Sequence, residues 1–274
     1  NEPRGLGSAV DCFGTGLSFF LLFRAQVAVK RWWEARGFLG AVCTHLRSIA
    51  CILSSLEESS DASSMEWWTE LAEWICAFPL LVSRAVVPRA TVEGAHIPAL
   101  PASLVGGPSK QHPEPVMLLV AIERRLQKGR ATKQITNSDT KLISTELRGL
   151  MIAVHGVLKV KYTNLPDPLT MAGRAATWTF SAVILPYYLA YMWHTQFDSD
   201  DLAREASMVW RHLFAFFLMV TLASSTLATI NAVGDTLAKP LSEGHFRLPV
   251  QRMMLDLSCN LKAIFQMEIG AVTR

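Results

Sequence analysis

The chain has 274 residues, of which half are hydrophobic and 18% are charged, and its formal net charge is +3. This composition is more apolar than that of most soluble domains, yet it holds too many charges for a chain buried wholly in a bilayer. We therefore expect a membrane part and an aqueous part. The basic residues are scattered rather than clustered, so the composition excludes a nucleic-acid-binding stripe and predicts no nucleic acid partner.

Three apolar runs are candidates for membrane-spanning helices, at residues 6–30, 173–193 and 213–234. The second and third contain uncharged stretches of about 19 residues or more, which is long enough to cross a hydrocarbon core. Asp11 and Arg24 interrupt the first run. We expect these two side chains to face protein, water or an interface, because a charged group in contact with lipid is costly.

The first run ends in basic residues and tryptophans, at Lys30, Arg31, Trp32, Trp33 and Arg36. Aromatic residues paired with basic residues are typical of a helix that meets the cytoplasmic surface of a bilayer. Arg31, Trp32 and Trp33 are therefore candidates for membrane-interface anchors or for residues that act in gating. The sequence leaves both roles open.

The charges of the connecting segments predict the orientation. Residues 194–212 are mainly acidic, whereas Lys and Arg populate residues 31–172 and 235–274. The positive-inside rule therefore predicts a short external loop at 194–212 and cytosolic segments on both sides. Three crossings place the N-terminal end outside, from which we expect an earlier span to precede this chain. Plasma membrane, thylakoid and bacterial inner membrane all fit.

The region between the first and second runs is predicted to be helical. Ser63 and Glu66 form a capping-box pattern before an amphipathic helix that places Trp67 on one face and Glu70 on another. A Pro-rich loop is expected over 88–115, and helical periodicity resumes over 116–128 and 139–161. No strand alternation occurs, so we predict an all-α, multi-pass membrane protein.

The five cysteines form no CxxC pair and have no His partner at metal-ligand spacing. We interpret them as buried thiols in a reducing compartment. The sequence predicts no metal site and no cofactor.

Three separated blocks resemble the bestrophin family, in particular its bacterial and plastid-type members. They are Leu17-Ser-Phe-Phe-Leu-Leu-Phe-Arg24 running into Arg31-Trp-Trp-Glu-Ala-Arg36; Thr163-Asn-Leu-Pro-Asp-Pro-Leu169 with Leu185-Pro-Tyr187; and Gly234-Asp-Thr-Leu-Ala-Lys-Pro240 with Leu248-Pro249. The resemblance implies a homopentameric channel in a lipid bilayer that conducts chloride or bicarbonate passively. It also implies a pore lined by the helix of the first block, above a large cytosolic helical region.

By matching within the first block, Phe19 and Phe23 occupy positions of the family's neck, the narrowest part of the pore, and Thr15 occupies the third. These residues are spaced i, i+4, i+8 and so share a helix face, although ordinary helix packing has the same spacing. Ser18 is a small polar neighbour, expected to bond locally or to face an adjacent helix. Arg24 lies about 100° around the helix from Phe23, so we expect a salt bridge to a neighbouring helix.

The other two blocks imply less. Family members have a cytosolic constriction just before the second span, which makes Thr163 and Asn164 candidates for its lining. Animal members bind calcium through an acidic cluster after the third block, but here Glu243 is the only acid and Arg247 stands nearby. A calcium site is therefore not expected.

Two other classes of function remain open. One is a non-conducting membrane scaffold, because Thr15 replaces the large aliphatic residue usual in the family. The other is an integral-membrane enzyme, since His45, His155, His194 and His212 lie near predicted membrane edges or cytosolic helices. No motif pairs these histidines with a ligand or a nucleophile, so no catalytic residues are predicted and the chain is not expected to be an enzyme.

Overall fold

The computed structural model describes residues 4–57, 62–87, 115–163, 167–188, 190, 206–241 and 248–266. Within these ranges the chain forms helices and no strand, which confirms the all-α class. The chain divides into two compact units. The first unit contains residues 1–32 and 164–239, and the second contains residues 33–163 and 240–274.

Helix α1 (Arg4–Glu57) is a single helix of 54 residues and contributes to both units. We expected a helix that leaves the membrane part near residue 30, but helical structure continues for almost thirty residues more. The reason lies in the sequence after residue 30, where apolar residues recur at helical spacing and are buried, as at Ala35, Leu39, Val42 and Leu46.

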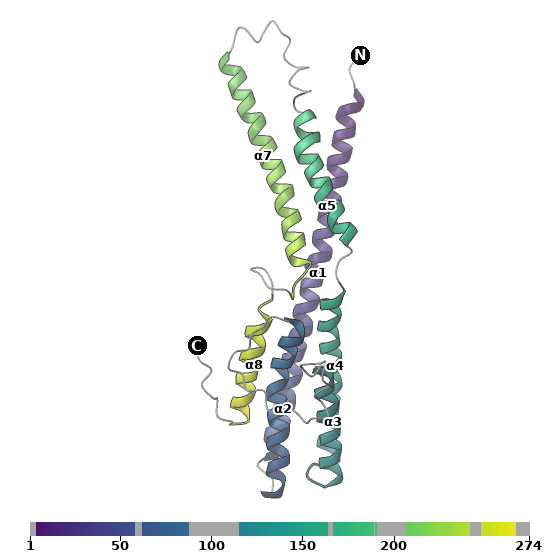
Figure 1. Cartoon of the computed structure of the whole chain (residues 1–274), viewed down its shortest axis with the longest axis vertical. Helices are drawn as coiled ribbons and strands as arrows, with labels where there is room; N and C mark the ends of the chain where they lie inside the picture. Colours follow the sequence, from purple (N-terminus) through teal and green to yellow (C-terminus); the bar gives the residue numbers. More distant parts are fainter. Residues whose placement is uncertain are drawn as a thin grey trace, which may run out of the picture. The chain divides into compact units, whose positions relative to one another are not determined.

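The first unit consists of the N-terminal part of α1, α5 (Asp167–Thr179), the π-helical turn η1 (Phe180–Ile184) and α7 (Ala206–Leu237). Figure 1 shows these helices alongside one another. A methyl group on Gly14 would lie 3.3 Å from Phe180 Cζ, and one on Gly173 would lie 3.0 Å from Arg24 Nη1. Since the later α1 residue meets the earlier α5 residue, α1 and α5 run antiparallel.

Two helices among the described residues are long and apolar enough to cross a membrane, within Val10–Leu56 and Leu213–Leu237. The expected span at 213–234 thus corresponds to α7, although α7 begins at Ala206. Part of the predicted external loop 194–212 is therefore helical, and residues 194–205 lie outside the described ranges.

The expected span at 173–193 is not one uninterrupted α-helix. Between α5 and the helical residues 185–188, η1 forms a π turn in which the Leu185 N–H donates to the Phe180 carbonyl five residues earlier. Residues 191–193 lie outside the described part of the chain. This crossing stays a prediction.

The second unit packs the C-terminal part of α1 with α2 (Ala62–Val86), α3 (Pro115–Ala131), α4 (Asn137–Tyr162) and α8 (Val250–Ile264). Each of these helices contributes fully buried apolar side chains, among them Leu46, Ile75, Ile122, Leu150 and Leu257. Tryptophan donors add links between helices: Trp68 Nε1 donates to the Leu53 carbonyl at 3.1 Å, and Trp67 Nε1 donates to the Arg125 carbonyl at 3.2 Å.

The helices predicted over 116–128 and 139–161 are confirmed as α3 and α4, while residues 88–114 of the expected loop lie outside the described ranges. The capping-box prediction is wrong in position, because α2 begins at Ala62, so that Ser63 is already inside the first turn. Helix α2 is also more buried than a one-faced amphipathic helix. Residues 74–83 are buried on every side, because α2 packs against α3, α4 and α8 together.

The interpretation of the cysteines as buried thiols holds for Cys76 alone. Cys12 and Cys51 are exposed, and Cys43 and Cys259 are partly exposed. Burial raises the pKa of the Cys76 thiol to about 12, because a thiolate is poorly solvated in an apolar interior.

Candidate functional site: an apolar stripe and a charge cluster on the first unit

Thr15, Phe19 and Phe23 share one exposed face of α1, which we call the neck stripe. Phe19 is 74% exposed and Phe23 is 58% exposed, and Thr15 is exposed beside them. The opposite face of α1 is buried, with Leu17 and Leu21 packed against Phe180. The stripe is thus not used to pack α1 against the other described helices of its own chain.

The polar neighbours of the stripe have local roles. Ser18 Oγ donates to the Gly14 carbonyl at 2.8 Å, which is one of the two roles expected for it. At the end of the unit, Arg31 and Trp32 are partly buried and Trp33 is 57% exposed, with the Arg36 guanidinium stacked 5.2 Å from its ring centre. Cation–π stacking of this kind holds an exposed tryptophan in place.

Arg24 lies on the buried side of α1 and is 1% exposed. Its Nη1 donates to Asn231 Oδ1 and its Nη2 forms an ion pair with Asp235 Oδ1, both on α7. The salt bridge expected from its position relative to Phe23 is therefore present. It satisfies a cation that would be very costly if it were left facing lipid.

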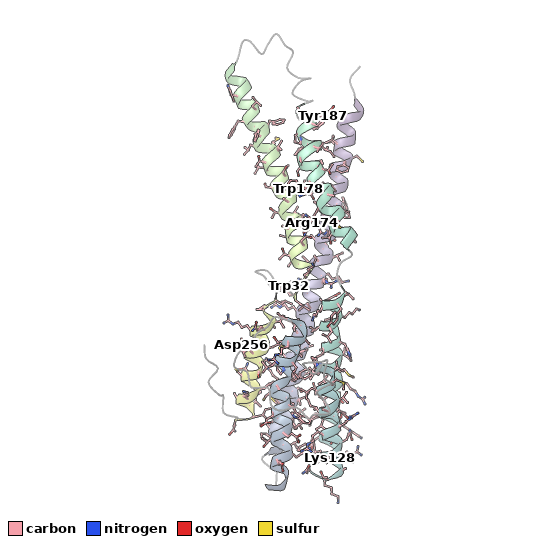
Figure 2. The ribbon with its side chains drawn as sticks, in the orientation of Figure 1. Trp32, Lys128, Arg174, Trp178, Tyr187 and Asp256 are labelled. Atoms are coloured by element: carbon pink, nitrogen blue, oxygen red, sulfur yellow. The ribbon has the colours of Figure 1, made fainter. Side chains whose placement is uncertain are left out.

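Arg174 on α5 binds the other oxygen of the same carboxylate. Its Nε and Nη2 lie 2.8 and 2.6 Å from Asp235 Oδ2. Figure 2 labels Arg174 at this level of α5, with Trp178 further along the helix. Arg24, Arg174, Asn231 and Asp235 form what we call the charge cluster, in which one carboxylate links three helices.

Sequence patterns alone did not identify Arg174, Asn231 or Asp235 as members of a site. A signal for two of them was present, because Arg174 lies just before an uncharged run and Asp235 just after another. When two neighbouring apolar runs are antiparallel, the start of one lies beside the end of the other. Charges of opposite sign at these two ends can therefore pair. Asn231 gives no comparable signal.

An apolar groove of about 690 Å³ lies beside the neck stripe, between α1 and α5. Its walls carry aromatic and small side chains and almost no polar surface. They are Cys12, Phe13, Gly16, Leu17 and Phe20 on α1, and Ala172 and Ala176 on α5.

The remaining sequence candidates are dispersed. Thr163 follows α4 and its Oγ1 donates to the Lys159 carbonyl at 2.7 Å, while Asn164 lies outside the described residues. His45 Nδ1 lies 2.8 Å from Glu146 Oε2, a pair that the sequence did not predict.

His155 is exposed, and the side chains of His194 and His212 are outside those described. No group of three or more His, Cys, Asp or Glu side chains that could hold a metal ion occurs in the described ranges.

The family described as "Bacterial/Fungal Bestrophin protein" matches residues 7–263, which is nearly the whole chain. The chain belongs to the bestrophin family. Bestrophins are ion channels, and the family places this chain in a membrane. A comparison with curated protein sequences finds no match.

Solved structures agree with this bestrophin assignment in fold. A bestrophin homologue from Klebsiella pneumoniae has a TM-score of 0.74 at 16% identity, covering 95% of this chain and 88% of its own. A variant of that homologue matches with a TM-score of 0.74 at 18% identity, covering 94% and 87%. A further membrane protein variant matches with a TM-score of 0.75 at 17% identity, covering 94% and 86%.

Proposed function

We propose that the chain is a subunit of a pentameric anion channel that conducts chloride and bicarbonate passively across a membrane, with the neck stripe as the narrowest part of its pore. The observation that carries the proposal is the exposure of Thr15, Phe19 and Phe23 on a helix whose opposite face is buried. Two large phenylalanine side chains exposed on one face need either lipid or further copies of the chain to cover them.

Five copies of the stripe would stack into rings around a central axis. Rings of Phe19 and Phe23 form a hydrophobic constriction that can gate by losing its water. The edge of each aromatic ring carries partial positive charge, so an anion that passes edge-on is attracted without being trapped. Thr15 adds a hydroxyl at the third ring, which makes that level more polar.

The apolar groove supports the oligomer. It runs along the flank of the stripe and carries small residues at Gly16, Ala172 and Ala176. Small residues permit close approach between helices in lipid, where apolar burial gives no driving force. We propose that α1 of a neighbouring copy covers this groove and so closes the ring.

We propose that the charge cluster lies at the cytosolic end of the membrane region. From Leu213 to Asp235, α7 rises about 33 Å, and from Arg4 to Arg24, α1 rises about 30 Å, the thickness of a hydrocarbon core. Trp32 lies about 12 Å beyond Arg24 along the helix. We therefore propose that Arg31, Trp32 and Trp33 act below the bilayer surface, at the passage from pore to cytosol, rather than as lipid anchors.

Three parts of the proposal concern topology and the lower pore. The segment 173–193 is a third crossing, which makes the protein multi-pass. Residues 194–212 then face outside, and residues 31–172 and 235–274 face the cytosol. Thr163 and Asn164, at the end of α4, line a second constriction in the cytosolic part.

The experiment is anion flux from liposomes that contain the purified chain. We expect chloride efflux in wild type, and an increase in efflux in a Phe19→Ala, Phe23→Ala double variant because the constriction is widened. Phe217→Ala, an exposed residue of α7, is the matched control and should leave efflux unchanged. A pentamer by cross-linking that shows no flux in any variant would instead establish a non-conducting scaffold.

A further inference from the structure

We propose that Asp235 sets the rotational position of α1 through Arg24, and thereby holds Phe23 on the exposed face of the helix. Asp235 is a positioning residue and does not itself contact the neck stripe. Only the consequence for conduction rests on the proposed channel function. The positioning itself is a property of the first unit and can be tested without any flux.

The attachment of Arg24 is of a kind that prevents rotation. Its two Nη atoms bind different acceptors, Asn231 and Asp235, which are four residues apart on α7 and therefore one above the other on the same face. A single hydrogen bond would allow α1 to turn or slide about it. Two bonds from one planar guanidinium fix both the height and the angle of the helix.

Arg24 and Phe23 are adjacent in sequence, so the angle between their side chains about the helix axis is set at about 100°. Any rotation of α1 that releases Arg24 must carry Phe23 with it. The buried Arg24 side chain thus fixes the rotation of α1 and therefore the direction in which Phe23 points.

Apolar contacts alone cannot fix the rotation of α1 within the membrane. Leu17 and Leu21 pack against Phe180, but a leucine side chain is nearly as well solvated by lipid tails as by protein. Turning α1 would therefore cost little through the leucines. It would cost much through Arg24, because its charge would lose its partner in a region of low dielectric.

Arg174 is not equivalent to Arg24 in this arrangement. Its side chain is 59% exposed, whereas that of Arg24 is 2% exposed. Arg174 can thus be solvated when Asp235 is removed, but Arg24 cannot. Asp235 therefore positions α1 mainly through Arg24, and Arg174 secures α5 to the same carboxylate.

Gly173 provides room for this contact. A methyl group at this position would lie 3.0 Å from Arg24 Nη1 and 3.6 Å from Asn231 Oδ1. The guanidinium therefore passes directly against the α5 backbone on its way to α7. The bare backbone at Gly173 lets three helices meet at one charge.

The test measures the accessibility of α1 faces with a membrane-permeant maleimide, in a parent chain whose five native cysteines are replaced. Maleimide reacts with the thiolate, which forms where water reaches the side chain, so fast labelling marks the face of α1 that meets water. In the parent, Phe23→Cys should react quickly and Leu21→Cys, on a buried face, slowly. Adding Asp235→Asn should raise the labelling rate of Leu21→Cys about tenfold, the change in a population ratio for a 1.4 kcal/mol loss of preference.

Two further variants separate positioning from general damage. Arg24→Gln combined with Asp235→Asn leaves no buried charge to relocate, so we expect most of the protection of Leu21→Cys to return. Arg174→Gln should leave the labelling pattern of the parent unchanged. An equal labelling rate of Leu21→Cys with and without Asp235→Asn, in protein that remains monodisperse, would overturn the proposal.

If Asp235→Asn does not fold, Arg24→Lys provides the same test, because it retains the charge but its single amine lacks the guanidinium fork that bonds both acceptors on α7. Intermediate labelling of Leu21→Cys supports the proposal, and parental labelling contradicts it. The flux assay is read separately. A shifted labelling pattern in a chain that never conducts would refute the channel proposal and leave the positioning role in place.

Discussion

The second unit buries Leu, Ile, Phe and Trp side chains of five helix segments against one another, whereas the first unit turns most of its large apolar side chains outward. In α7, none of residues 213–233 is buried. The first unit nevertheless buries a charged residue. Among the described residues, the largest fully buried side chain is that of Arg24, which belongs to this unit. The difference supports the proposal that the second unit meets water and the first meets lipid: water drives apolar side chains together, and lipid leaves polar pairs and small residues to hold helices in place.

The sharpest way to test this comparison is the same truncation in both units. Phe78 is fully buried in α2 and Phe217 is 71% exposed in α7. We expect Phe78→Ala to cost about 3–5 kcal/mol of unfolding free energy through lost burial and a cavity. Phe217→Ala should cost less than about 0.5 kcal/mol. Denaturant unfolding in detergent, followed by tryptophan fluorescence, measures both; equal losses would contradict the assignment of solvents.

The second test removes one carboxylate from an ion pair in each unit. Asp235→Asn leaves the buried Arg24 charge unpaired and should cost about 3 kcal/mol or more. Glu70 pairs with Arg125 in the second unit, where both side chains are partly exposed to solvent. Glu70→Gln should therefore cost about 0.2–1 kcal/mol. Similar shifts in unfolding midpoint for the two variants would mean that the charge cluster is solvated.

A third test concerns close approach between helices of the second unit. A methyl group on Gly156 would overlap the Phe38 ring, which brings α4 against α1. Gly156→Ala should destabilise by about 1–3 kcal/mol through overpacking. Gly40→Ala is the matched control, since open space surrounds this exposed position of α1. It should be neutral or stabilising by up to about 1 kcal/mol, so a loss at Gly40 equal to that at Gly156 would argue against the packing described.

The smallest effect on stability, and the most local one, is thiol reactivity within the second unit. Burial raises the pKa of Cys76 to about 12, so at pH 8 only about one molecule in ten thousand carries the thiolate, and the side chain of Cys51, unlike that of Cys76, is exposed to the reagent. A water-soluble maleimide should modify Cys51 at least about a hundred times faster.

The raised pKa of Cys76 also makes the free energy of unfolding depend on pH. Because the folded pKa lies above the unfolded value, the contribution of Cys76 is complete below pH 9 and is lost as pH rises toward 12. Rapid modification of Cys76 in the native protein at pH 8 would show that α2 is not buried on every side.

Sequence periodicity predicted the helices of the second unit well because burial in water leaves a strong apolar pattern. The helix predicted over 139–161 corresponds to α4 at Asn137–Tyr162, where Thr136 caps the start and bonds the Asp139 N–H. The same reasoning did not predict that one helix continues to Glu57, since the basic and aromatic residues near position 31 are typical of a membrane exit and draw attention away from the buried positions that follow.

For the candidate site, the sequence placed the neck stripe on one face of α1 and predicted that Arg24 would pair. It did not identify the partner, because Asp235 is more than 200 residues away and pairing at that distance depends on how helices pack. An isolated charge beside an apolar run could pair with any of several opposite charges in the chain, and the sequence does not distinguish among them. Only the antiparallel arrangement of α1 and α5 and the contact with α7 select one.

The π turn at Phe180–Ile184 has a consequence for how this chain tolerates insertions and deletions. A π turn holds one residue more than an α turn closing the same gap, so it is the footprint of an extra residue within a regular helix. Its removal would turn the helical residues 185–188 by about 100° relative to α5 and shorten the segment by about 1.5 Å. A homologue one residue shorter at this point would therefore present a different side of that segment while leaving Arg174 and the charge cluster in register.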